Sequence, residues 1–91
     1  GGDDSPAVIP ELEYPLTMDV KVIGNNEGPF AEDMLQLACE CTGQKPEDVQ
    51  VRWRDKGKYR SVTLRCYFEN AQQVYNVYAA IDRDPRVKYK L

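Results

Sequence analysis

Apolar and polar side chains alternate in four stretches of this 91-residue chain, and two other stretches repeat at helical spacing. In residues 16–22 every second residue is apolar until Gly24 ends the pattern, which predicts a half-buried first strand. The same alternation predicts strands over residues 49–54, 61–68 and 86–91. In the last strand, the residues expected to face the core are Val87, Tyr89 and Leu91.

Two segments, residues 30–41 and 71–81, repeat apolar side chains every three to four positions and predict amphipathic helices. Pro29 suits the first turn of the first helix, and Gly43 suits a left-handed cap at its end. Asn70, with Gln73 three positions later, has the spacing of a capping box. The order predicts an α+β, ferredoxin-like β-α-β-β-α-β sandwich, with two helices on one face of a four-stranded antiparallel sheet.

The segment between the two middle strands predicts a hairpin turn at Gly57. Because side chains change face at each residue, both strands direct their apolar sets inward only if the loop has an even number of residues. With Val51 opposite Val62, the loop is either Lys56 and Gly57 alone or residues 55–58. Gly57 supplies the positive φ of such a turn. A strand follows it, whereas a phosphate-binding loop leads into a helix.

The first 13 residues are predicted to be a disordered acidic leader, and residues 14–91 a single domain. The leader contains two glycines, two prolines and four acidic residues, and such a composition buries too little apolar surface to offset chain ordering. The chain has a net charge of -3 and 42% hydrophobic residues, without an apolar run near the roughly 18 residues of a membrane helix. We therefore expect a soluble protein that does not enter a membrane. Its three cysteines form no even disulfide framework, which predicts a reducing, intracellular and cytoplasmic location.

Histidine is absent from the sequence, which removes the commonest general base and the usual partner of a serine or cysteine nucleophile. The three cysteines, Cys39, Cys41 and Cys66, match neither a paired disulfide framework nor a zinc motif. Cys41 and Cys66 fall on predicted core faces, which leaves Cys39 as the candidate for a redox role. We expect no catalytic residue, metal or cofactor, and hence no enzyme.

The sheet face opposite the helices is expected to be basic, with only Asp19 against its cations. A concentrated patch of this kind attracts phosphates or carboxylates, so we take it as a candidate surface for a partner or an anion. Its residues are Lys21, Arg52, Arg54, Tyr59, Arg65, Tyr67, Lys88 and Lys90. RNA-recognition motifs stack bases on this face, but Lys58 and Arg60 stand where their aromatics belong. The alternatives are a solvated face or half of a dimer interface.

Three stretches, "YPLTMDVKVIG", "GKYRSVTL" and "QVYNVYAAI", resemble the YbeD-like proteins, small domains of unknown function from bacteria, plants and algae. The resemblance covers residues 14–91, and its most specific positions are Gly57, Tyr59, Ser61 and Val62. It implies the same fold, which is similar to ACT-type regulatory domains, and thus a regulatory or adaptor role. It also implies a plastid location if the source is a plant or an alga.

An ACT-type site would lie at the turn between the first strand and the first helix. The resemblance implies that Asn25, Asn26 and the backbone near Gly28 bind a small carboxylate or amino group; otherwise these are turn and cap residues. We interpret the chain as a non-catalytic regulatory or adaptor domain that binds a small metabolite or a partner protein. The alternative is nucleic-acid binding through the basic face. A homodimer through an open sheet edge is a further arrangement.

Overall fold

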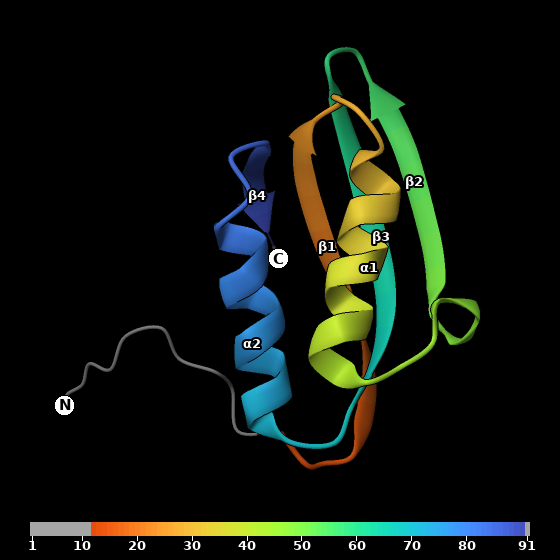
Figure 1. Cartoon of the computed structure of the whole chain (residues 1–91), viewed down its shortest axis with the longest axis vertical. Helices are drawn as coiled ribbons and strands as arrows, with labels where there is room; N and C mark the ends of the chain where they lie inside the picture. Colours follow the sequence, from red (N-terminus) through yellow and green to blue (C-terminus); the bar gives the residue numbers. More distant parts are fainter. Residues whose placement is uncertain (1–11, 91) are drawn as a thin grey trace, which may run out of the picture.

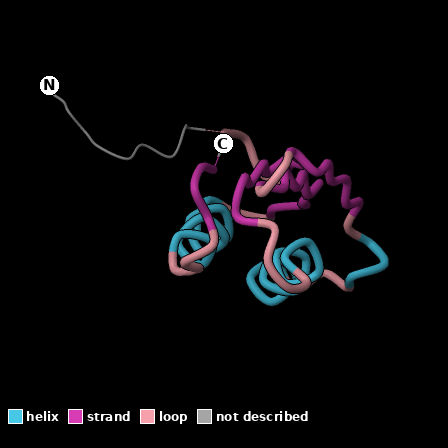
Figure 2. The backbone as a smooth tube through the Cα atoms, turned by 90° about the horizontal axis from the view of Figure 1, so that it is seen from above, coloured by secondary structure: helices cyan, strands magenta, loops and turns pink. Residues whose placement is uncertain are grey.

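The computed structural model describes residues 12–90, which form four strands, two α-helices and one 3-10 turn. In chain order they are β1 (Leu16–Asn25), α1 (Phe30–Thr42), η1 (Pro46–Asp48), β2 (Gln50–Lys56), β3 (Tyr59–Phe68), α2 (Ala71–Asp82) and β4 (Val87–Lys90). The antiparallel sheet has the order β2-β3-β1-β4 (Figure 1). Both helices lie on one side of it (Figure 2). The predicted ferredoxin-like sandwich is confirmed; the predicted leader lies mostly outside the described residues.

The core lies between the helices and the sheet face that they cover. Its largest fully buried side chains come from β1, β3 and both helices, and they are Val20, Val22, Phe30, Met34, Val62, Leu64, Cys66, Phe68, Val77 and Ile81. Burial of this apolar surface is the main favourable contribution to folding. No helix of residues 12–90 covers the opposite face of the sheet (Figure 2).

The helix ends follow the predicted capping residues. Gly43 has a φ of 76° and donates its N–H to the carbonyl oxygen of Cys39. The Asn70 side chain accepts the N–H of Gln73 at 3.0 Å, while the Gln73 side chain accepts the N–H of Glu69 at 2.7 Å. Pro29 is itself the N-cap of α1 rather than part of its first turn. Neither helix within residues 12–90 has the length and apolar character needed to cross a membrane.

The cysteines are buried in a different order from the one predicted. Cys39 and Cys66 are buried, and Cys41 is only partly buried. Burial raises the pKa of the Cys66 thiol to about 12, and it also raises the pKa values of Cys39 and Cys41. Reactive cysteines have lowered pKa values and accessible sulfur atoms. These properties argue against a redox role for Cys39.

The hairpin between β2 and β3 has the predicted parity but a different register. Val51 lies opposite Leu64 and Trp53 opposite Val62, so the expected pairing of Val51 with Val62 is wrong by two residues. The two-residue loop therefore begins at Gly57, which has a φ of 67°. Alternation determines which face of the sheet a side chain occupies. Shifting the pairing of β2 and β3 by two residues leaves every side chain on the same face, so the position of the turn decides the register.

A register shift in β4 reverses the faces of its last residues. Val22 lies opposite Lys90 and Ile23 opposite Tyr89, whereas Gly24 lies opposite Val87, so Lys88 is the extra residue of a β-bulge. Opposite residues share a face, which places Lys90 on the helix side with buried Val22. Tyr89 is on the open face and is 68% exposed. The predictions that Tyr89 faces the core and Lys90 the open side are wrong; Leu91 lies outside the described residues.

Candidate functional site

Five cations lie together on the open side of the sheet, and we call this surface the cationic face. The strand registers place them there, because they alternate with core-facing residues on β1, β2 and β3. The cations are Lys21, Arg52, Arg54, Lys56 and Arg65. Asp19, opposite Arg65 in the sheet, is the acidic residue of this face. The cationic face therefore carries a formal charge of +4.

Few charges of the cationic face are neutralised by residues 12–90. Asp19 is shared, because its Oδ2 accepts from Arg52 Nη2 at 3.3 Å and its Oδ1 from Arg65 Nη1 at 3.2 Å. The Arg52 and Arg65 side chains are 74% and 51% exposed, and ion pairs this exposed contribute little to stability. Lys21, Arg54 and Lys56 have no ion-pair partner within residues 12–90. Among the described residues nothing pairs with these three cations, so an external anion can bind them.

The cationic face contains two adjoining hollows that are open to solvent. The first has a volume of about 290 Å³ and is lined by Trp53 and by polar and basic residues, including Lys21, Arg54 and Ser61. The second, of about 220 Å³, includes Asp19 and Arg65. Both are bordered by Arg52 and Thr63, so they form one continuous basic strip. Small-molecule sites usually enclose most of the ligand surface and are largely apolar, and this strip lacks both properties.

The two tyrosines predicted for this face lie at its opposite ends. Tyr59 is opposite Asn25 on β1, and Tyr67 is opposite Thr17 and is 42% exposed. Tyr67 follows Tyr59 by eight positions along one strand, a distance of about 26 Å. The face between them presents Ser61, Thr63 and Arg65 of β3. The middle of the sheet thus lacks the stacked aromatics of an RNA-recognition motif.

The two C-terminal lysines assigned to this face by sequence do not line its two adjoining hollows. Lys88, in the bulge, borders a separate hollow of about 450 Å³ together with Asn25, Asn26 and Tyr59. Lys90 Nζ pairs with Asp82 Oδ1 at 2.7 Å on the helix side. Sequence reasoning missed Lys56 because it placed the turn one residue early. The even-numbered alternation of β2 was the signal for Lys56.

The three residues implied for an ACT-type ligand are engaged in shaping their own loop. Asn25 donates its N–H to the carbonyl oxygen of Arg86 at 2.8 Å. Asn26 donates its N–H to the carbonyl oxygen of Lys58, also at 2.8 Å. The Asn26 side chain also donates to Asp55 at 3.3 Å. Gly28 has a φ of 60°, and its carbonyl oxygen accepts the N–H of Phe30. Asn25 and Asn26 border the hollow beside Lys88, but Gly28 does not.

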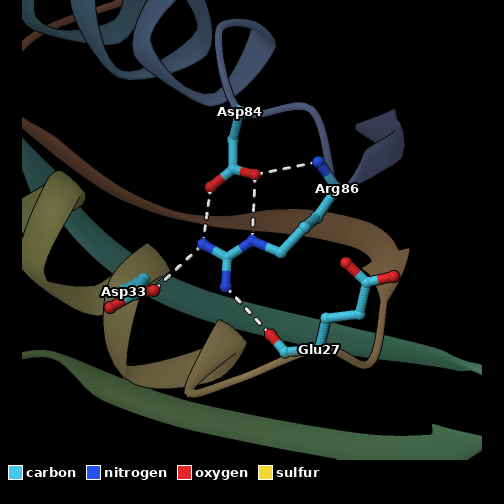
Figure 3. A network of polar contacts seen from close by, with 4 residues as sticks. All are labelled: Glu27, Asp33, Asp84 and Arg86. Carbon is cyan, nitrogen blue, oxygen red and sulfur yellow. Dashed lines mark hydrogen bonds and ion pairs between the residues drawn. The ribbon is translucent and has the colours of Figure 1, made fainter.

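Arg86 occupies the space beside the start of α1 (Figure 3). Its guanidinium donates to Asp84 from Nε at 3.0 Å and from Nη2 at 2.7 Å, to Asp33 at 3.0 Å, and to the Glu27 carbonyl oxygen at 3.0 Å. The Arg86 and Asp84 side chains are only 19% and 15% exposed. Hydrogen bonds from Arg86 lower the pKa of the Asp84 carboxyl. An anionic ligand placed here would meet two carboxylates.

The Arg86 network joins segments that are distant in sequence, and sequence reasoning missed it. It ties the loop after β1, the first turn of α1 and the turn before β4 together. The only local signal is the spacing of Asp84 and Arg86, two residues apart on either side of a proline. The contacts to Glu27 and Asp33 depend on the fold. The network is therefore structural, and the cationic face is the better candidate for binding.

Comparisons with known proteins agree on the family and the fold. Residues 10–91 match the family described as "Protein of unknown function (DUF493)". A UPF0250 protein from Neisseria gonorrhoeae is 27% identical over 81 residues, which cover 88% of this chain and 89% of the relative. The UPF0250 protein RSc0326 from Ralstonia nicotianae is 29% identical over 97 residues, covering 98% of this chain and 96% of the relative.

Among solved structures, the solution structure of protein HP0495 from Helicobacter pylori is similar, with a TM-score of 0.69 and 17% sequence identity. The match covers 100% of this chain and 97% of HP0495, and at this identity it supports the fold alone. The UPF0250 relatives are YbeD-like, so the resemblance seen in the sequence is confirmed. The chain therefore belongs to the DUF493 family of YbeD-like domains, whose function is unknown.

Proposed function

We propose that this domain is a non-catalytic adaptor that binds an acidic segment of a partner protein through its cationic face. The observation that carries the proposal is the uneven distribution of charge. A face of charge +4 in a chain of net charge -3 leaves a formal charge of -7 elsewhere. Such a distribution steers an acidic partner to one side of the domain and repels it from the others.

The shape of the face favours a protein partner over a small metabolite. Its hollows are open and basic, and arginine is enriched in protein–protein interfaces relative to the rest of the surface. The metabolite form of the hypothesis relied on Asn25, Asn26 and Gly28. Their hydrogen bonds to neighbouring segments, together with the carboxylates around Arg86, leave few groups for an amino acid or small acid.

Nucleic-acid binding through the same face is the second candidate, and Tyr59 and Tyr67 are the observation that favours it. Single strands are held by cations along the backbone and by stacking on aromatic rings. If all five cations contacted phosphates, affinity for single-stranded RNA would fall about a hundredfold between about 50 and 200 mM salt. The wide separation of the two tyrosines makes this the weaker candidate.

The test compares a labelled glutamate-rich peptide with labelled single-stranded RNA, using fluorescence anisotropy at low and high salt. We expect the peptide to bind and the variant Arg52→Ser/Arg54→Ser to lose at least about tenfold in affinity. The matched control is Lys45→Ser/Arg83→Ser, which removes the same charge from exposed positions outside the face. It should bind like the wild type.

Two results would contradict the adaptor proposal. One is a wild-type protein that does not bind the acidic peptide, and the other is an equal loss of affinity in the control variant. Binding of RNA alone, with the steep salt dependence given above, would establish the second candidate in its place.

A further inference from the structure

The two edges of the sheet differ in length and regularity. β4 has four residues and contains the bulge at Lys88, and short or bulged edges resist pairing with another strand. β2 has seven residues, from Gln50 to Lys56, and pairs with β3 without a register shift. Within the described residues β2 has no strand on its other side. The outer edge of β2 is therefore available for addition of a further strand.

The side chains of β2 give its two faces different chemistry. Arg52, Arg54 and Lys56 belong to the cationic face. Trp53 points to the helix side, yet it is 54% exposed. An added strand alternates its side chains in the same way. It would place every second residue beside the arginines and the others beside the indole.

Trp53 is held in place by its neighbour on β3. The guanidinium carbon of Arg60 lies 4.1 Å from the centre of the Trp53 ring system. Asp55 fixes Arg60, since its Oδ1 accepts from Arg60 Nε at 2.6 Å and its Oδ2 from Nη2 at 3.3 Å. Exposed tryptophans that are already ordered lose little conformational entropy on binding, and they are frequent hot spots of interfaces.

We propose that the outer edge of β2 binds an extended segment of the partner protein in which acidic and apolar residues alternate. The acidic side chains lie beside Arg52 and Arg54, the apolar ones pack on Trp53, and the backbones share hydrogen bonds. The inference rests on the proposed function. It adds the edge that the partner uses, the conformation in which it binds, and the sequence pattern that the edge selects.

Charge also argues against a second copy of this chain at the same edge. In an antiparallel β2 pair centred on Trp53, Arg52 of one copy would lie opposite Arg54 of the other, and Gln50 opposite Lys56. Like charges directly opposite each other destabilise a strand pair. The positive charges of Arg52 and Arg54, which would repel a second copy of β2, attract a strand with acidic side chains.

Synthetic peptides test the pattern and the backbone pairing separately. The first peptide alternates glutamate and valine, and the second has the same composition with the two residue types in separate blocks. Two further versions of the first are N-methylated on its odd or its even backbone amides, so that only one of them can donate hydrogen bonds to β2. Trp53 is the only tryptophan of the chain, and its fluorescence reports occupation of the edge.

We expect the alternating peptide to bind about tenfold more tightly than the blocked one, and one methylated version to lose binding while the other keeps it. Trp53→Ala should weaken binding about tenfold, as measured by anisotropy of labelled peptide. The control is Tyr75→Ala, which removes an aromatic that is 56% exposed on α2. It should leave affinity unchanged.

The possible failures are distinguishable. Equal binding of all four peptides would overturn strand addition but leave an acidic partner on the cationic face. Absence of binding by any acidic peptide would overturn both proposals. A dimer in sedimentation, with β2 amides protected from hydrogen exchange, would show that a second copy occupies the edge. RNA binding that is lost in Trp53→Ala would show that nucleic acid occupies it.

Discussion

Arginine has contrasting surroundings in two regions of this domain. Arg86 is 19% exposed, and its guanidinium donates to two carboxylates and a carbonyl oxygen that come from three separate segments. On the cationic face, Arg52 is 74% exposed and shares Asp19 with Arg65. Enclosed charges with many partners stabilise a fold only as a complete set, whereas exposed charges with few partners contribute little. The first region should govern stability and the second binding.

Among the changes that test this comparison, replacing Arg86 should lower the free energy of unfolding the most. Arg86→Met keeps much of the side-chain length but leaves the nearly buried Asp84 carboxylate without its partner. We expect the free energy of unfolding to fall by about 2–4 kcal/mol, measured by urea denaturation. The control, Arg52→Met, should change it by less than about 0.5 kcal/mol. Similar losses in both variants would remove the distinction between the two regions.

Gly24→Ala tests the same region through its packing. A Cβ atom at this position would lie 2.5 Å from Phe30 Cζ and 2.7 Å from the carbonyl oxygen of Arg86. We expect a loss of about 1–3 kcal/mol, typical of overpacking in a core, again by urea denaturation. Combining the change with Phe30→Leu should reduce its cost, because the pair is coupled. A neutral Gly24→Ala would mean that the turn before β4 moves easily.

Acid should weaken the Arg86 network once the pH is low enough to protonate Asp84. Arg86 holds the pKa of Asp84 below its ordinary value of 3.8, so the folded state favours the carboxylate. The resulting stabilisation is complete above pH 3.8 and is lost as the pH falls through the lowered value. Asp84→Asn should therefore show a shallower decline of unfolding free energy in acid. Parallel declines in the two proteins would contradict this role.

The smallest effect is expected from the acidic residue of the cationic face. Asp19→Asn removes a carboxylate that is 41% exposed, so stability should change by less than about 0.5 kcal/mol. Affinity for the acidic peptide should rise about twofold to threefold, because the charge of the face increases. Fluorescence anisotropy of the labelled peptide at low salt measures this affinity. Weaker binding would instead show that Asp19 positions Arg52 and Arg65 for the partner.

Alternation and capping residues were sufficient to predict the fold and most of the cationic face. Parity alone places Lys21, Arg52, Arg54 and Arg65 on one side of the sheet, because a strand of regular pleat has only two faces. Parity also survives the two-residue error in the predicted register of the hairpin. It fails in β4, where the bulge at Lys88 shifts the following residues to the other face.

The remaining features depend on distances that a pattern does not contain. Arg86 finds Glu27 and Asp33 only after the sheet has formed, so its network has little local signature. Trp53 alternates with Arg52 and Arg54 as a core-facing residue of β2 would, yet it is 54% exposed. Both cases depend on which segments lie near a side chain in the folded domain, and the periodicity of the sequence does not contain this information.

The raised pKa values of the native thiols make this domain convenient for selective labelling. Because all three native cysteines have raised pKa values, little thiolate is present at neutral pH for a maleimide or iodoacetamide to attack. A cysteine introduced on the solvent side of β2 would react at its ordinary rate. A photocrosslinker attached there could capture whatever lies along that edge in a living cell, without first removing the native thiols.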